Sequence, residues 1–115
     1  MKLTPEILAA AYDYNKTWEP FNKWNFPDAE EVEFRVIKSA AVHGWYAMRD
    51  GKHIIAISAR TVGFPTTLIR VMAHEMIHLH QQEAGMANAA QHNRAFQKLA
   101  ERVAKIHGYD PKEFW

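Results

Sequence analysis

Three histidines and a glutamate lie within seven consecutive positions of this sequence. The stretch reads VMAHEMIHLHQQEAG and contains His74, Glu75, His78 and His80. If it is helical, His74 and His78 are four residues apart and project from the same face, about one turn from each other. Two imidazoles placed in this way can bind one zinc ion at about 2.0 Å each. The pair therefore predicts part of a metal site.

Glu75 follows the first histidine of the pair and points about 100° away from it around the helix. This direction suits a carboxylate that contacts the zinc-bound water instead of the metal and acts as a general base. The pattern His-Glu-x-x-His is typical of zinc hydrolases, although chance can produce it in a chain with seven histidines. A hydrolytic site also needs a third protein ligand and one position left for water.

Three arrangements could supply the third ligand. A metzincin site would need a glycine at Gln81 and a histidine at Ala84, so that arrangement is excluded. A glutamate on a later helix is the second arrangement, and Glu101 is the only glutamate in the last predicted helix. The third arrangement uses His92, which follows His78 in the chain.

Helical projection favours His92 over Glu101. With His92 at 0°, Glu101 lies at about 180°, whereas four apolar residues lie within about 40° of His92. These residues are Phe96, Leu99, Val103 and Ile106. Because an apolar stripe marks the side that packs inward, we expect His92 to face the preceding helix and Glu101 to face water. The alternative is that His92 lies in the N-cap region of its helix, half exposed and hydrogen-bonded.

The helices that must position these residues are predicted by local signals. A first helix is predicted in LTPEILAAAYDYNKTWEP, with Thr4 as its N-cap. The helix that carries the cluster is expected from about Thr67 to Ala84, capped by Thr66 or Thr67 and closed by Gly85. A last helix, HNRAFQKLAERVAKIHG, ends at Gly108.

Three strands are predicted between the first two helices. They are Glu31–Lys38, His43–Arg49 and Lys52–Ser58. Asp50-Gly51 is a residue pair favoured in the tight turn of a hairpin and joins the last two strands. We expect a small three-stranded antiparallel sheet within an α+β fold, followed by two C-terminal helices that carry the metal site.

Length, composition and charge limit the possible functions. With 115 residues, 48% of them hydrophobic, the chain is expected to form a single domain, 1–115. The charged residues are scattered along the chain and sum to a net charge of +1, which favours neither a polyanion nor a membrane surface as partner. The absence of cysteine excludes disulfides, thiolate-bound zinc and a thiol nucleophile. The sequence has no signal-peptide pattern and no apolar run of about 18 residues, so we expect a soluble cytoplasmic protein.

The sequence resembles the SprT-like family of zinc metalloproteases, which includes the Spartan DNA–protein crosslink proteases. The likeness rests on AHEMIHLH, on a later histidine and on the phenylalanine four residues after it in HNRAFQKLAERVAKIHGYD, and it covers roughly Val32–Tyr109. It implies a zincin-like fold with Zn²⁺ as cofactor. By position, it implies His74, His78 and His92 as zinc ligands and Glu75 as the catalytic base.

The resemblance implies hydrolysis of a protein or peptide substrate by a zinc-activated water. Two departures bear on this prediction. Asn93 stands where the family more often has a glycine, and this chain has neither the zinc ribbon nor the DNA-binding extensions of many members. We therefore expect a minimal catalytic domain. Association with DNA is supported only by the family resemblance. The alternative function is an inactive, zinc-stabilised binding module, with or without association to DNA.

Several further residues have expected places. The candidates for stabilising the oxyanion, by residue type alone, are Tyr46, Tyr109 and His107. Either Glu31–Lys38 or Lys52–Ser58 is expected to pair, as an edge strand, with an extended substrate. His43 and His53 are expected to be solvated near the hairpin. His80 is expected at the surface or beside the ligands, not among them.

Overall fold

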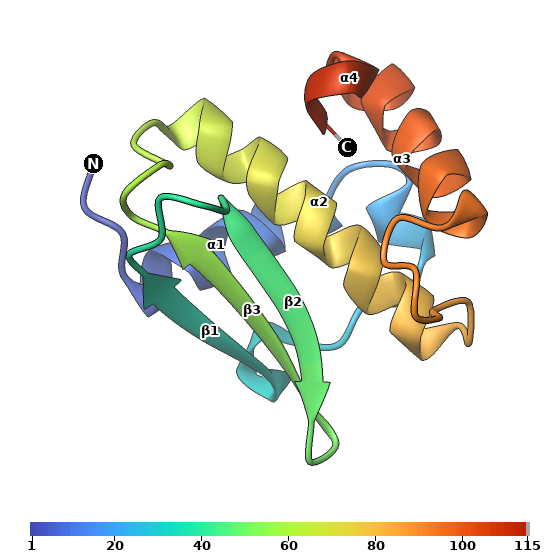
Figure 1. Ribbon diagram of the computed structural model, residues 1–115, viewed down its shortest axis with the longest axis horizontal. Helices are drawn as coiled ribbons and strands as arrows, with labels where there is room; N and C mark the ends of the chain where they lie inside the picture. The colour runs from blue at the N-terminus through green and yellow to red at the C-terminus, as the bar shows by residue number, and fades with distance from the viewer. Residues whose placement is uncertain (115) are drawn as a thin grey trace.

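The computed structural model describes residues 1–114 and confirms the α+β class (Figure 1). The helices are α1 (Pro5–Lys16), α2 (Pro65–Glu83), α3 (Arg94–His107) and the short α4 (Pro111–Phe114). The strands are β1 (Val32–Ile37), β2 (Gly44–Arg49) and β3 (Lys52–Ser58). Among the described residues, no helix combines the length and the apolar composition of a membrane span.

The sheet is mixed, so the prediction of an antiparallel sheet is wrong. β3 lies between the other two strands, parallel to β1 and antiparallel to β2. Its residues from His53 to Ser58 are all buried, which is typical of a strand with a neighbour on each side. The hairpin between β2 and β3 is confirmed, since Asp50 and Gly51 both have positive φ, 52° and 75°.

Two helices cover one face of the sheet. α1 and α2 pack on the side that carries Ile55 and Ile57 of β3, where the apolar core lies (Figure 1). On the other side of β3, Ala56 is flanked by Trp45 of β2, and Arg49 lies over the Trp45 ring at 5.6 Å. α3 and α4 pack against α2 on the side away from the sheet (Figure 1). α2 is therefore the central helix of the molecule.

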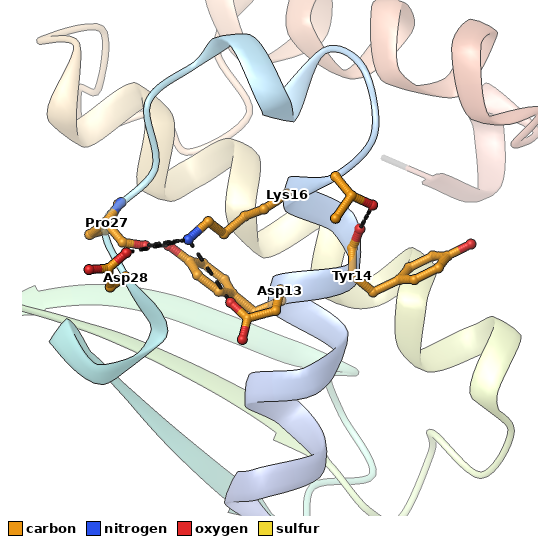
Figure 2. A network of polar contacts seen from close by, with 7 residues as sticks. Asp13, Tyr14, Lys16, Pro27 and Asp28 are labelled. Carbon is orange, nitrogen blue, oxygen red and sulfur yellow. Dashed lines mark hydrogen bonds and ion pairs between the residues drawn. The ribbon is translucent and has the colours of Figure 1, made fainter.

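The start of α1 is as predicted, and its end is tied to the segment before the sheet. Thr4 caps the helix, because its hydroxyl oxygen accepts a hydrogen bond from the Ile7 N–H at 3.2 Å. Figure 2 shows Lys16 reaching toward the next segment. Its Nζ donates to the Pro27 carbonyl at 3.4 Å and lies 3.9 Å from the Asp28 carboxylate. These contacts hold the chain close to α1 before it enters β1.

The ends of α2 and α3 differ in part from the predictions. Phe64, not Thr66 or Thr67, is the N-cap of α2, and no side chain caps this end. Pro65 takes the first helical position, where its lack of an N–H has no cost. The expected αL residue after α2 is confirmed at Gly85, with φ 71°. α4 was not predicted, and Pro111 takes its first position.

Candidate metal site

Three histidines lie close together: two from α2, His74 and His78, and one from the turn before α3, His92. Each offers a ring nitrogen, and these three atoms all lie within 4.8 Å of one another. The ring centroids are 5.0, 5.1 and 5.2 Å apart. In a tetrahedral site with Zn–N distances of about 2.0 Å, the centroids of the ligating imidazoles lie roughly 5 Å apart. The spacing of the three rings therefore fits a single divalent ion with metal–nitrogen distances like those of zinc.

His92 reaches the other two histidines from a turn and not from the face of a helix. It precedes Asn93, the N-cap of α3, and its side chain is exposed. The projection from a helix that includes His92 was therefore wrong about the element, because the helix begins only at Arg94. His92 is exposed in the N-cap region, as in the alternative, but its ring faces those of His74 and His78 on the preceding helix, as the projection predicted. Glu101 is exposed, as expected.

Phe96 lies beneath the three imidazoles and sets their spacing. Its side chain is fully buried and comes from the first turn of α3. The ring stacks on those of His78 and His92, with centroid distances of 4.5 Å in both pairs. It meets the His74 ring at an angle of 60° and 5.0 Å. The phenylalanine in the family-like motif thus supports the histidines.

Two of the imidazoles have a hydrogen-bond partner at Nδ1. His74 Nδ1 lies 2.7 Å from the carbonyl oxygen of Phe114 in α4. Because a carbonyl can only accept, His74 carries its proton on Nδ1 and keeps the lone pair on Nε2. His78 Nδ1 lies 3.3 Å from Oε1 of Gln81. Such bonds at one ring nitrogen orient the other nitrogen toward a metal.

The short helix α4 is held in place beside the site. Arg70 of α2 donates a hydrogen bond to the carbonyl oxygen of Glu113 at 3.1 Å. Phe114 is buried, and its ring lies 6.0 Å from that of His74. No sequence pattern predicts this role, because a helix of four residues is too short to show periodicity.

Burial keeps the histidines of α2 neutral. It lowers the pKa of His74 to about 4 and that of His78 to about 4, and nearby imidazoles add to the effect. Desolvation also lowers the pKa of His92. Neutral imidazole is the form that binds metal ions. In the metal-free protein, the two half-buried rings are therefore already in their ligating form at pH 7.

Glu75 is a buried carboxyl group in the wall of a cavity. Its side chain is 4% exposed, and burial raises its pKa to about 8. It lies against the start of β2, where a Cβ built on Gly44 would be 3.4 Å from Glu75 Oε2. The same Cβ would be only 2.5 Å from the carbonyl oxygen of Ala56. Gly44 therefore allows β2 to approach both β3 and the glutamate.

Two cavities flank the three histidines. One of about 290 Å³ is lined by His74, Glu75 and His92, and its other walls include Gly44 and Phe114. The second, of about 170 Å³, lies beside His78 and is lined by β2 residues and by the loop after α2. β2 contributes to both cavities and forms one edge of the sheet. An extended chain on this edge would pass the histidines.

The expected substrate edge has to be corrected. Lys52–Ser58 cannot pair with a substrate, because β3 has a strand on each side. The two edges of the sheet are β1 and β2. Of these, β2 is the one that lines the cavities beside the histidines, and the sequence prediction did not include it.

The oxyanion candidates have other partners. The Tyr46 hydroxyl is hydrogen-bonded to His53 Nδ1 at 2.6 Å, and His107 Nε2 donates to the Glu19 carbonyl at 2.7 Å. Tyr109 stacks on His107, with ring centroids 5.5 Å apart. None of the three candidates lines the cavity beside Glu75.

The remaining histidines lie outside the group of three. His53 is buried, so the expectation that it is solvated is wrong; it occupies the central strand and contacts Glu83 at the end of α2. His43 is exposed and lines the larger cavity. His80 stacks on Trp24, with ring centroids 4.3 Å apart.

The fold and the three histidines together define an α+β domain that could bind a metal. A model of the SprT-like family matches residues 13–113, nearly the whole chain. The chain therefore belongs to the SprT-like family, and the match extends beyond the range Val32–Tyr109 that the motifs suggested. Membership indicates a metalloprotease-like, metal-dependent domain. A search of curated proteins finds no match to this chain.

Proposed function

We propose that this chain is a zincin-like zinc metalloprotease domain that hydrolyses peptide bonds. His74, His78 and His92 would hold Zn²⁺, and Glu75 would act as the general base. The observation that carries the proposal is the group of three imidazoles, two of which line one cavity together with the buried carboxyl group of Glu75. This donor set has three nitrogen ligands and leaves room for water, which is typical of catalytic zinc.

When bound, zinc would supply a polarised substrate carbonyl and a water of lowered pKa. Glu75 would take a proton from the water as the water oxygen attacks the carbonyl carbon. It would then pass that proton to the amide nitrogen as the C–N bond breaks and the amine leaves. The carboxyl group must be ionised to accept the proton. A divalent cation close by favours the carboxylate and opposes the effect of burial on the pKa of Glu75.

The substrate would bind as an extended chain on the outer edge of β2. Main-chain hydrogen bonds to an exposed strand edge bind peptides with little regard to their sequence. Gly44 at one end of β2 lines the larger cavity, and Met48 near the other end lines the smaller one. A peptide lying between these positions would have side chains in both cavities and a peptide bond near Glu75.

The alternative function is a binding module in which zinc only ties α2 to the turn before α3. Glu75 favours hydrolysis over this alternative. A structural zinc site usually has four protein ligands and has no use for a buried carboxyl group beside it. Burying such a group without an ionic partner costs stability, and a catalytic role accounts for that cost.

The test compares the parent protein with Glu75→Gln. Metal analysis should find one zinc per chain in both proteins, because Glu75 is not a ligand. Cleavage of an unfolded protein such as casein, with and without DNA, should fall by about 10²–10⁴-fold in the variant, which is the usual contribution of a general base. A parent that binds zinc but cleaves nothing under any of these conditions would support the binding module instead.

A further inference from the structure

A chain of side-chain hydrogen bonds leads from the start of α3 to one of the histidines. It begins at Asn93, the N-cap of the helix. Asn93 Oδ1 accepts from the Phe96 N–H at 2.9 Å, and Asn93 Nδ2 donates to the Met86 carbonyl at 3.0 Å. A backbone N–H can only donate and a carbonyl can only accept. The orientation of the Asn93 amide is therefore fixed by the backbone on both sides.

Gln81 passes this orientation on to His78. The side chain of Gln81 is 1% exposed, and its Nε2 donates to Asn93 Oδ1 at 2.9 Å. Since Asn93 Oδ1 is an acceptor, Gln81 must present its NH₂ group there and turn Oε1 toward His78 Nδ1, 3.3 Å away. A proton on His78 Nδ1 is the only arrangement that completes this bond. The lone pair of His78 is then on Nε2, the atom free to bind a metal.

The same two amides attach the turn that carries His92. Asn93 directly follows His92, and its bond to Gln81 joins this turn to α2. His92 itself is exposed, and the hydrogen bond from Gln97 Nε2 to its carbonyl, at 3.2 Å, comes from within the same segment. The Gln81–Asn93 bond thus supplies a link between the elements that carry the second and third histidines.

We propose that Gln81 and Asn93 are positioning residues that work as one unit on two of the three histidines. The pair fixes the tautomer of His78 and holds His92 near α2. This inference rests on the three-histidine metal site of the proposed function, but it is independent of hydrolysis. His74 differs, because its tautomer is fixed by a backbone carbonyl that no substitution at Phe114 removes.

The first experiment reads the tautomer in the metal-free protein. Long-range ¹H–¹⁵N correlation spectra at pH 7.5 should show His78 with its proton on Nδ1 in the parent. Gln81→Glu should keep this tautomer, because a carboxylate also accepts, whereas Gln81→Leu should lose it. A parent with the proton on Nε2, or a Gln81→Leu protein that keeps the Nδ1 proton, would overturn the proposal. This readout needs no bound metal, so it decides the inference even if the proposed zinc site fails.

The second experiment measures the coupling of the two residues through Zn²⁺ affinity, with a chelating dye as competitor. Gln81→Leu and Asn93→Ala should each weaken binding by about 10–100-fold, as for other partners of metal-ligating histidines. The double variant should be no weaker than the poorer single variant, because either change breaks the same chain. Losses that multiply in the double variant would show that the two residues act separately.

Two further variants separate positioning from folding. Asn93→Asp keeps an oxygen that can accept from both Phe96 and Gln81, so it should restore affinity close to that of the parent. Asn22→Ala removes an exposed amide outside the site and should have no effect. Co²⁺ absorption should show four-coordinate metal in the parent and in Asn93→Asp. A rescue failure in Asn93→Asp, with the far-UV circular dichroism of the parent, would contradict the proposed role of the Asn93 oxygen.

Discussion

The two halves of the histidine site are built in different ways. One half consists of His74, Glu75 and His78, which lie within about one and a half turns of α2. The opposite side of this helix is buried in the core at Met72 and Met76. The other half, His92, comes from an exposed turn. In the first half, the backbone of a regular helix sets the distance between the rings. In the second, contacts made by the side chains of Phe96 and Asn93 do so.

This difference explains what each half requires from the rest of the molecule. The α2 half needs the helix to be placed against the sheet, which the core accomplishes. The His92 half needs Phe96 beneath the ring and the Asn93 bond to Gln81. A regular helix fixes the relative positions of its own side chains wherever it packs. A residue in a turn needs contacts with other parts of the fold to hold it in place.

The largest expected effect is the loss of metal affinity in His92→Ala. Removing a ligand should weaken Zn²⁺ binding by more than about 100-fold, beyond the loss caused by removing the partner of a ligand. Because the side chain is exposed, the free energy of unfolding of the metal-free protein should change by less than about 0.5 kcal/mol. Dye competition and urea unfolding measure the two effects.

His80→Ala is the control for this comparison. It removes a histidine of α2 that stacks on Trp24 and lies outside the group of three, so it should leave the zinc affinity unchanged. Equal affinities in His92→Ala and the parent would mean that the exposed half does not belong to the metal site.

The second expected effect is on the stability of the protein, and it arises beside Glu75 in the α2 half of the site. In Gly44→Ala, the new methyl group would lie 2.5 Å from the Ala56 carbonyl oxygen, and a backbone atom cannot move aside without disturbing β3. Overpacking of this kind costs about 1–3 kcal/mol of unfolding free energy. Urea unfolding should show this loss, together with weaker peptide cleavage because Glu75 lies next to the same position.

Gly63→Ala is the matched control, since no atom lies within 4 Å of a Cβ built there. Its stability should stay within about 0.5 kcal/mol of the parent. If both variants were equally stable, the close approach of β2 to Glu75 would be wrong.

The sequence predicted the regular half of the site well. Spacing within a helix is a local property, so the pattern of His74, Glu75 and His78 was enough to place the three residues on one stretch of helix. Thr4 and the Asp50-Gly51 turn were likewise correct, because caps and tight turns depend on a few neighbouring residues.

The sequence did not predict the features that depend on distant contacts. Alternating apolar residues identify strands but not their neighbours, so the prediction of a fully antiparallel sheet was wrong. The continuous apolar run in Lys52–Ser58 is a signal for a central strand that could have corrected it. The position of His92 in a turn, and the Phe114 carbonyl beside His74, follow from packing between elements and have no local pattern.

The last comparison of the two halves is made through pH. Burial raises the pKa of Glu75 to about 8 in the folded, metal-free protein, whereas the unfolded chain has the ordinary value near 4.5. Between these values the folded state holds a proton that the unfolded state has lost. Stability from this group is therefore complete below pH 4.5 and falls as pH rises, by at most about 1.4 kcal/mol per unit up to about pH 8.

Glu75→Gln isolates this contribution, because glutamine does not titrate. His74 and His78 have a lowered pKa of about 4, so they make the folded state less stable as pH falls from about 6.5 to 4, but they do so in both proteins. Urea unfolding of the metal-free proteins from pH 5 to pH 8 should thus show the parent losing stability relative to Glu75→Gln. Adding His92→Ala should leave that difference unchanged, because His92 is exposed and the raised pKa of Glu75 comes from its own burial. Parallel curves for the parent and Glu75→Gln would show that Glu75 is solvated, and the contrast between the two halves would then be lost.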